Sequence, residues 1–84
     1  KLEQNYPNPF NPSTMINYTV PAGTKVKLAV YDLLGKEVAV LVDSYKDAGS
    51  YTVEFNGFNL PSGVYFYNLQ TDKHSSTKKL MLMK

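Results

Sequence analysis

Residues 16–30 read INYTVPAGTKVKLAV, and this stretch decides the fold class. Apolar and polar side chains alternate in two runs, whose apolar members are Ile16, Tyr18 and Val20, then Val26, Leu28 and Val30. A period of two with one polar face is typical of half-buried β-strands, because successive side chains point to opposite sides of a sheet. Residues 21–24 contain Pro and Gly, so we expect the two strands to form a hairpin.

The stretch after this pair allows two interpretations. Gly35 suits a turn with positive φ, and a third strand is predicted beyond it with Val38, Val40 and Val42 on one side. Residues 37–48 also fit helical spacing, and Gly49 would then be a C-cap. We favour the strand because β-branched side chains lose rotamer freedom in helices, and the helix stays open as the alternative.

Alternation returns in the second half of the chain. Further strands are predicted over residues 51–55, 64–71 and about 78–83, with turn residues between them. Six or seven short strands at regular intervals predict an all-β fold, because a sheet with one apolar face must bury that face against another sheet. The sequence therefore indicates an antiparallel β-sandwich.

Length and charge limit the function. The chain has 84 residues, no cysteine and a net charge of +2, and all nine basic residues are Lys. A chain of this length is one domain that packing alone must hold together. Lys lacks the fork of Arg that suits phosphate and base edges, so nucleic acid is not expected as a partner. No apolar run is long enough for a transmembrane segment, and the start at Lys1 suggests a fragment of a longer protein.

The strongest local signal lies near the start. Residues 5–14 read NYPNPFNPST, in which three closely spaced prolines restrict φ and remove backbone donors. We expect an ordered, extended lead-in over residues 1–13 that cannot serve as a central strand and that fixes Phe10 in the core. The alternative is a surface that a partner recognises.

Four segments together resemble a known family. The lead-in 5–14, the turn 31–38 (YDLLGKEV), the run 60–67 (LPSGVYFY) and the terminal 79–84 (KLMLMK) are similar, in this order, to the type A C-terminal sorting domain of the type IX secretion system, also called the Por secretion system. The resemblance covers nearly the whole chain. It extends more loosely to the immunoglobulin-like domain of flagellar hook-capping proteins. The motif positions expected to be structural are Pro7, Asn8, Pro9, Phe10, Gly35, Gly63 and Tyr65.

The resemblance implies a fold and a function. Such domains are immunoglobulin-like antiparallel β-sandwiches of about seven short strands at the C-terminus of exported proteins of Gram-negative bacteria. Residues 1–84 would be one sorting domain, with residues 78–84 as the terminal strand signal. A cargo on the N-terminal side would fold in the periplasm and pass through the outer-membrane translocon. A sortase-like surface peptidase would then remove the domain, which acts as a monomer, is not an enzyme and needs no cofactor.

The residues suggest how a translocon could read the domain. Two predicted strands are apolar on both faces, since Val64 and Phe66 alternate with Tyr65 and Tyr67, and Leu80 and Leu82 with methionines. Either a loop or the proline-rich lead-in covers the second face, or an exposed apolar stripe docks on the translocon, helped by backbone pairing if the last strand is an edge. The expected partner-binding residues are Phe66, Lys78, Lys79, Met81, Met83 and Lys84.

Catalytic and metal chemistry have little support. His74 is the only histidine and falls in a polar stretch, which predicts a solvated loop residue. The acidic residues have neither the spacing of a calcium-binding loop nor a pair of carboxylates placed for acid–base catalysis. A second hypothesis is carbohydrate binding through Tyr65, Phe66 and Tyr67, as in sandwiches appended to secreted hydrolases. A third is a structural spacer.

Overall fold

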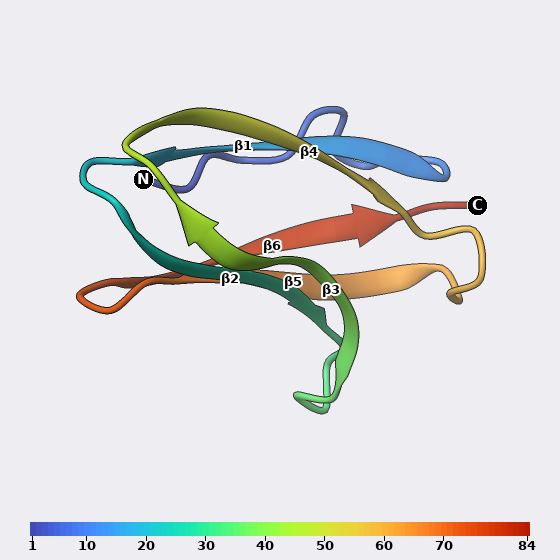
Figure 1. The fold of residues 1–84 in the computed structure, drawn as a ribbon. Helices are drawn as coiled ribbons and strands as arrows, with labels where there is room; N and C mark the ends of the chain where they lie inside the picture. Colours follow the sequence, from blue (N-terminus) through green and yellow to red (C-terminus); the bar gives the residue numbers. More distant parts are fainter.

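The computed structural model describes all 84 residues as two stacked antiparallel sheets without a helix. Figure 1 shows a two-stranded layer, β1-β4, above a four-stranded layer of order β3-β2-β5-β6. The strands are β1 (Ser13–Val20), β2 (Thr24–Tyr31), β3 (Glu37–Lys46), β4 (Gly49–Asn56), β5 (Gly63–Gln70) and β6 (Ser75–Leu82). The all-β sandwich is confirmed with six strands instead of about seven, and residues 37–46 form a strand, which excludes the helix.

The first two strands do not form the expected hairpin. β1 pairs with β4, with Ile16 opposite Val53, whereas β2 pairs with β3 and β5. The connection at residues 21–23 carries the chain from one sheet to the other (Figure 1). Both strands have one apolar face, and these faces bury each other across the sandwich instead of lying side by side in one sheet.

The third strand departs from simple alternation. The pairing of β2 with β3 shifts register so that Leu28 lies opposite Val42 and Ala29 opposite Val40, which leaves Leu41 as an extra residue. Such a bulge breaks the two-residue period. Val40 is consequently exposed while Leu41 and Val42 are half-buried, so the prediction that Val38, Val40 and Val42 share one face is wrong.

The core lies between the sheets and follows the predicted apolar phases. It contains 14 buried residues from the lead-in and from every strand except β3. The aromatic ring of Phe10 packs against that of Phe55 at 5.8 Å between centroids, and Tyr18 stacks on Tyr51 at 5.4 Å. All buried side-chain polar atoms have hydrogen-bond partners. No helix here could span a membrane. The core residues are Leu2, Phe10, Ile16, Tyr18, Val20, Val26, Leu28, Val30, Phe55, Tyr65, Tyr67, Leu69, Leu80 and Leu82.

The lead-in joins the two sheets along one side of the sandwich. Leu2 and Tyr6 bridge to β1, and Phe10 bridges in parallel to Leu82 of β6. The lead-in therefore crosses between layers, which requires it to bend. It bends at residues 7–9 and 11–12, so the expected extended conformation is wrong there. Phe10 is 2% exposed, which confirms its expected place in the core.

Candidate functional site

An apolar stripe runs over the outer face of the four-stranded sheet. Pairing places Val64 opposite Met81, Phe66 opposite Lys79, and Tyr31 opposite Phe66. Met81 is exposed, and the other three apolar side chains are half-buried. We call Tyr31, Val64, Phe66 and Met81 the outer-face stripe. Neighbouring positions on β5 and β6 point into the core, so the two apolar faces expected from sequence are one packed face and one face that the lead-in does not bury.

The predicted binding residues do not all lie on this face. Lys79 shares the strand phase of Met81 and is exposed, and Met83 lies just beyond β6 and is also exposed. Lys78 falls on the opposite phase, that of Leu80 and Leu82, and is half-buried. The structure therefore brings Phe66, Lys79 and Met81 together and leaves Lys78 on the other side of the strand.

Lys84 is held against the loop before β5. Its backbone N–H donates to Ser62 Oγ at 3.0 Å, and its ammonium group donates to the carbonyl oxygen of Phe58. The same ammonium nitrogen lies 5.6 Å from the centre of the Phe58 ring, within the range of a cation–π contact. Lys84 therefore fixes the end of the chain at this loop and is not a free charge beside the stripe.

The lead-in covers the C-terminal end of the β6 edge. β6 is the outermost strand of its sheet, but Phe10 N–H donates to Met81 O at 3.0 Å and Met83 N–H donates to Phe10 O at 2.9 Å. Asn8 Oδ1 accepts from Met81 N–H, and Gln4 Nε2 donates to Lys79 O. The lead-in thus takes up the edge-facing groups of Lys79 O, Met81 and Met83 N–H, which limits strand addition at the C-terminal end of β6. No lead-in bond reaches the first half of the strand, from Ser75 to Lys78.

The partner-binding residues expected from the sequence omit two members of the stripe, Tyr31 and Val64, and two residues beside it, although Val64 was placed on an apolar strand face. Tyr31 belongs to the stripe because it shares the outward phase of Lys25, Lys27 and Ala29, and an aromatic residue on a polar phase was the available signal. Val64 joins it through its pairing with Met81. Leu33 and Leu34 lie in the β2–β3 turn with 68% and 94% of their surfaces exposed. The sequence signal that could have identified them is the presence of two apolar residues in an otherwise polar turn.

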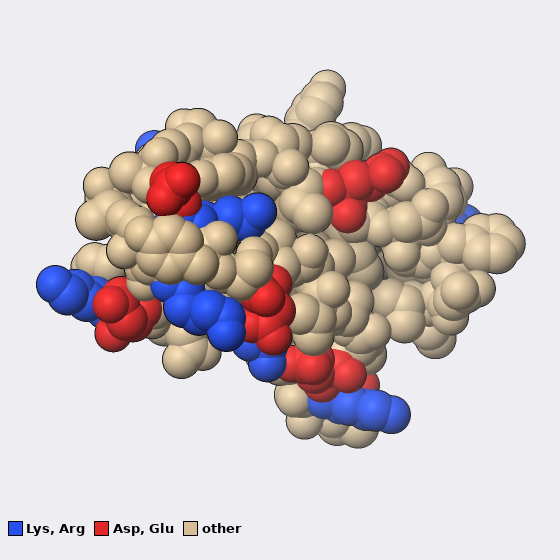
Figure 2. Space-filling view, viewed as in Figure 1, with Lys and Arg blue, Asp and Glu red and all other residues tan.

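Charges on the face seen in Figure 2 alternate in sign. Lys27 Nζ lies 2.9 Å from Glu37 Oε1, and Lys25 Nζ lies 3.5 Å from Asp43 Oδ1, so these ion pairs cross between β2 and β3. The hydrogen bond to Glu37 raises the pKa of Lys27 above its ordinary value. Exposed pairs of this kind contribute little to stability. They leave no extended basic surface on this face for a polyanion.

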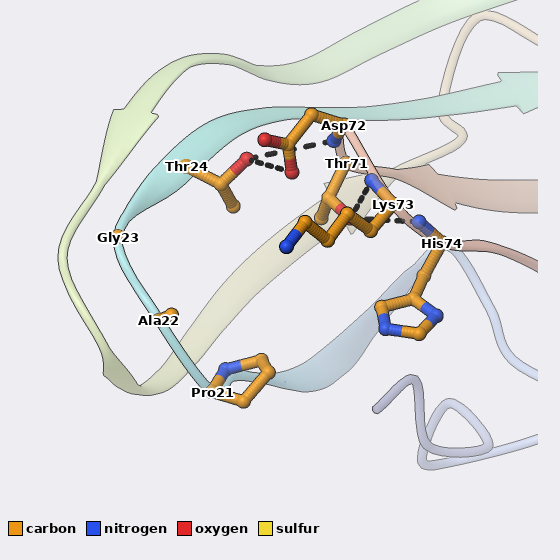
Figure 3. A pocket seen from close by; sticks show the side chains of 8 residues that line it. All are labelled: Pro21, Ala22, Gly23, Thr24, Thr71, Asp72, Lys73 and His74. Carbon is orange, nitrogen blue, oxygen red and sulfur yellow. Dashed lines mark hydrogen bonds between the residues drawn. The ribbon is translucent and has the colours of Figure 1, made fainter.

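A small polar pocket of about 150 Å³ lies at the other end of the sandwich, between residues 21–24 and 71–74 (Figure 3). Thr24 Oγ1 donates to Asp72 Oδ1 at 2.8 Å, which ties the two connections together. Thr71 Oγ1 accepts the backbone N–H of His74, whose exposed ring points away from the Asp72 carboxylate in Figure 3. The prediction of a solvated His74 is confirmed. No three His, Cys, Asp or Glu side chains gather to form a metal site.

The aromatic side chains proposed for carbohydrate binding do not form a surface. Tyr65 and Tyr67 are buried, and their hydroxyls donate to the carbonyls of Pro61 and Glu3. Burial raises the pKa of the Tyr67 hydroxyl, partly offset by the N–H that Asn5 donates to it. Neither ring can join Phe66 in the exposed planar row that a sugar needs.

These features describe a small β-sandwich with an apolar outer stripe and a terminal strand whose C-terminal end is covered by the lead-in. The family model described as secretion system C-terminal sorting domain matches residues 4–83. The chain therefore belongs to this family, the sorting domains of type IX secretion, which is a family of signals and not of catalysts. Membership implies interaction with the type IX machinery and export to the cell surface or extracellular space. No curated protein and no solved structure matches the chain.

Proposed function

We propose that this domain is a non-catalytic export signal whose outer-face stripe is read by the type IX outer-membrane translocon. It directs a folded periplasmic cargo, joined on its N-terminal side, to the cell surface. The family match supports the sorting role, and the stripe supplies a surface for it. The domain works as a monomer, and residues 1–84 act as one unit.

The single observation that carries the proposal is the position of Phe66 and Met81. Phe66 lies on the second strand from the edge, and Met81 lies on the edge strand beside it, with Val64 as the intervening neighbour. Because the lead-in closes the edge and not this face, the stripe stays in contact with water. Contiguous apolar surface rimmed by polar residues marks a contact site in soluble proteins. Lys79, beside Phe66, adds a positive charge at the rim.

A sortase-like peptidase then removes the domain from the cargo. The lead-in pairs with the sandwich from Leu2 onward, so a cut on its N-terminal side leaves every strand pair in place. The domain would be the substrate of that peptidase. Cargo release or attachment at the surface follows from the cut.

The test fuses residues 1–84 behind a reporter carrying a Sec signal peptide in a host with type IX machinery. The wild-type fusion should reach the surface, and a fusion without residues 78–84 should stay in the periplasm. That deletion removes five of the eight residues of β6, so the sharper variant is Phe66→Asp with Met81→Glu. This double variant should stay in the periplasm although circular dichroism shows that it is folded.

The matched control is Met15→Glu on the other sheet. Met15 is 42% exposed and Met81 36%, so the control adds a charge at an equally exposed methionine away from the stripe. The control should reach the surface. Export of the folded double variant would reject recognition through the outer-face stripe. Retention of the wild-type fusion in the periplasm would reject the sorting role. Saturable glycan binding by the purified domain would favour the carbohydrate alternative, and the spacer alternative predicts neither export nor glycan binding.

A further inference from the structure

The β1-β4 sheet covers the inner face of β3 only in part. Val26 and Leu28 of the neighbouring strand β2 are fully buried, whereas no residue of β3 is buried. Leu41 and Val42 of β3 pack against the core but are only half-buried. In Figure 1, β3 and β4 join at residues 47–48 and then diverge along their length. The two-stranded sheet therefore stops short of β3.

The outer edge of β4 has unpaired backbone groups. On β1, backbone groups of Asn17 and Thr19 bond to the lead-in, and these two residues lie opposite Thr52 and Ser50. In an antiparallel pair, opposed residues that do not bond to each other point their N–H and C=O groups in opposite directions. Those of Ser50, Thr52 and Glu54 therefore point away from β1, and no backbone group of the loops or lead-in bonds to them. The pairing of β4 with β1 has no register shift, so the free groups form one regular row.

One extended strand fits beside β4, and a second copy of the domain does not. A strand paired with β4 would lie over β3, because neighbouring strands are about 4.8 Å apart and stacked sheets about 10 Å apart. Its alternate side chains would point at Leu41 and Val42 and complete their burial. Two copies joined β4 to β4 by a two-fold axis would bring the β3 of each beneath the β4 of the other, where a sheet already lies. The free position is therefore a single strand wide.

The chain enters the domain close to this position. Lys1 N donates to Thr19 O and Thr19 N–H donates to Lys1 O, both at 2.8 Å, and Thr19 lies opposite Ser50. Lys1 is thus two strands away from β4 and three strands, or about 14 Å, from a strand on its far side. About five extended residues span that distance. Because the N-terminus lies at the end where β4 begins (Figure 1), a strand that leads into Lys1 would run antiparallel to β4.

We propose that the segment of the full-length chain just before Lys1, which links the cargo to the domain, adds a strand to the free edge of β4. This inference rests on the proposed function, which joins the cargo on the N-terminal side. A tethered segment has a high effective concentration at the edge, which favours it over a separate protein. Its chemistry is that of a half-buried strand, with apolar side chains at alternate positions facing β3.

The added strand also has a consequence for the exported protein. An open edge can pair with the edges of other chains, so the cover would keep cargo-bearing molecules from associating. A cut before Lys1 would release this strand and expose the β4 edge, while the pairs within residues 1–84 stay in place.

Hydrogen exchange, resolved to single amides, tests the added strand. The full-length protein is prepared from cells that lack the surface peptidase, so that the segment stays attached. The amides of Ser50, Thr52 and Glu54 should exchange about tenfold more slowly, or slower still, than in the 84-residue domain, because a bonded amide exchanges only when its bond opens. The amide of Thr77, in the half of β6 that the lead-in leaves free, should exchange equally in both proteins. Equal exchange of the three β4 amides in both proteins would overturn the proposal.

A proline variant tests the same edge independently. Thr52→Pro removes the central free N–H, and edge strands tolerate Pro where that N–H faces solvent. In the full-length protein this variant should return the Ser50 and Glu54 amides to their rates in the 84-residue domain. The control Thr77→Pro makes the same change at an exposed threonine on β6 and should leave these rates unchanged. Continued protection of Ser50 and Glu54 in the folded Thr52→Pro protein would also contradict the added strand.

Two other occupants would give different results. Protection of the β4 amides in the 84-residue domain that grows with concentration would assign the edge to a second copy. Protection that appears only with detergent-purified translocon would assign it to that partner, and either result overturns the proposal. Exchange is measured without export, so retention of the wild-type reporter fusion rejects the sorting role. Unprotected β4 amides in an exported protein reject the added strand alone.

Discussion

Removing the Phe10 side chain should be the most damaging single change in the lead-in. The ring is 2% exposed, packs against Phe55 at 5.8 Å, and lies where the lead-in meets β6. Phe→Ala at buried sites costs about 3–5 kcal/mol through lost transfer energy and the remaining cavity. A domain of this length has a free energy of unfolding of roughly 4–13 kcal/mol. Phe10→Ala should therefore remove between about a quarter and all of the stability.

The free energy of unfolding is measured by urea denaturation followed by circular dichroism. The melting temperature should fall by roughly 12–40 °C, given about 4–8 °C per kcal/mol for a domain of this size. Hydrogen exchange should accelerate at the Met83 amide, which donates to Phe10 O. The control Tyr6→Ala lies in the same segment, is 80% exposed, and should change stability by less than about 0.5 kcal/mol. A decrease of less than about 1 kcal/mol in the free energy of unfolding of Phe10→Ala would refute the conclusion that the Phe10 ring holds the lead-in against the sandwich.

Three further outcomes follow from the same contacts. Tyr67→Phe leaves the N–H of Asn5 and the carbonyl of Glu3 without their shared hydroxyl and should cost about 1–3 kcal/mol, measured by urea denaturation. Burial raises the pKa of Tyr18 and of Tyr67, so the unfolded chain loses these protons first as pH rises. Stability should be constant with respect to these groups below pH of about 10 and decline above it, and a pH series of melts that stays flat to pH 11 would contradict this. Gly35→Ala should cost about 1 kcal/mol because φ is positive, whereas Gly35→Asn should cost less; equal melting temperatures for the alanine variant and wild type would count against the turn geometry.

Much of the fold follows from alternation alone. The inward phases at Ile16, Tyr18 and Val20 and at Val26, Leu28 and Val30 are buried as predicted. Alternation is a local property, because each side chain's direction depends on its position along its own strand. Alternation therefore indicates which residues are buried, but it does not indicate which strands pair with each other. That is why the sandwich was predictable and the β1–β2 hairpin was not.

The candidate site was predictable only in part, for a related reason. Phe66 and Met81 stood out because they are apolar on the second face of apolar strands. Tyr31 joins them only through pairing of β2 with β5, and Leu33 meets Val64 only where two distant turns come together. Lys78 shows the opposite error, since adjacency to Lys79 in sequence places the two on opposite faces of one strand.

The sequence by itself determined the all-β class, the buried phase of the first two strands, the burial of Phe10 and the family. Tertiary structure alone decided which strands pair, that β3 carries a bulge, and that the lead-in bonds to the backbone at the C-terminal end of β6. The physical reason is range: side-chain alternation and turn residues act over a few positions, whereas the bonds between Phe10 and β6 join residues about seventy positions apart.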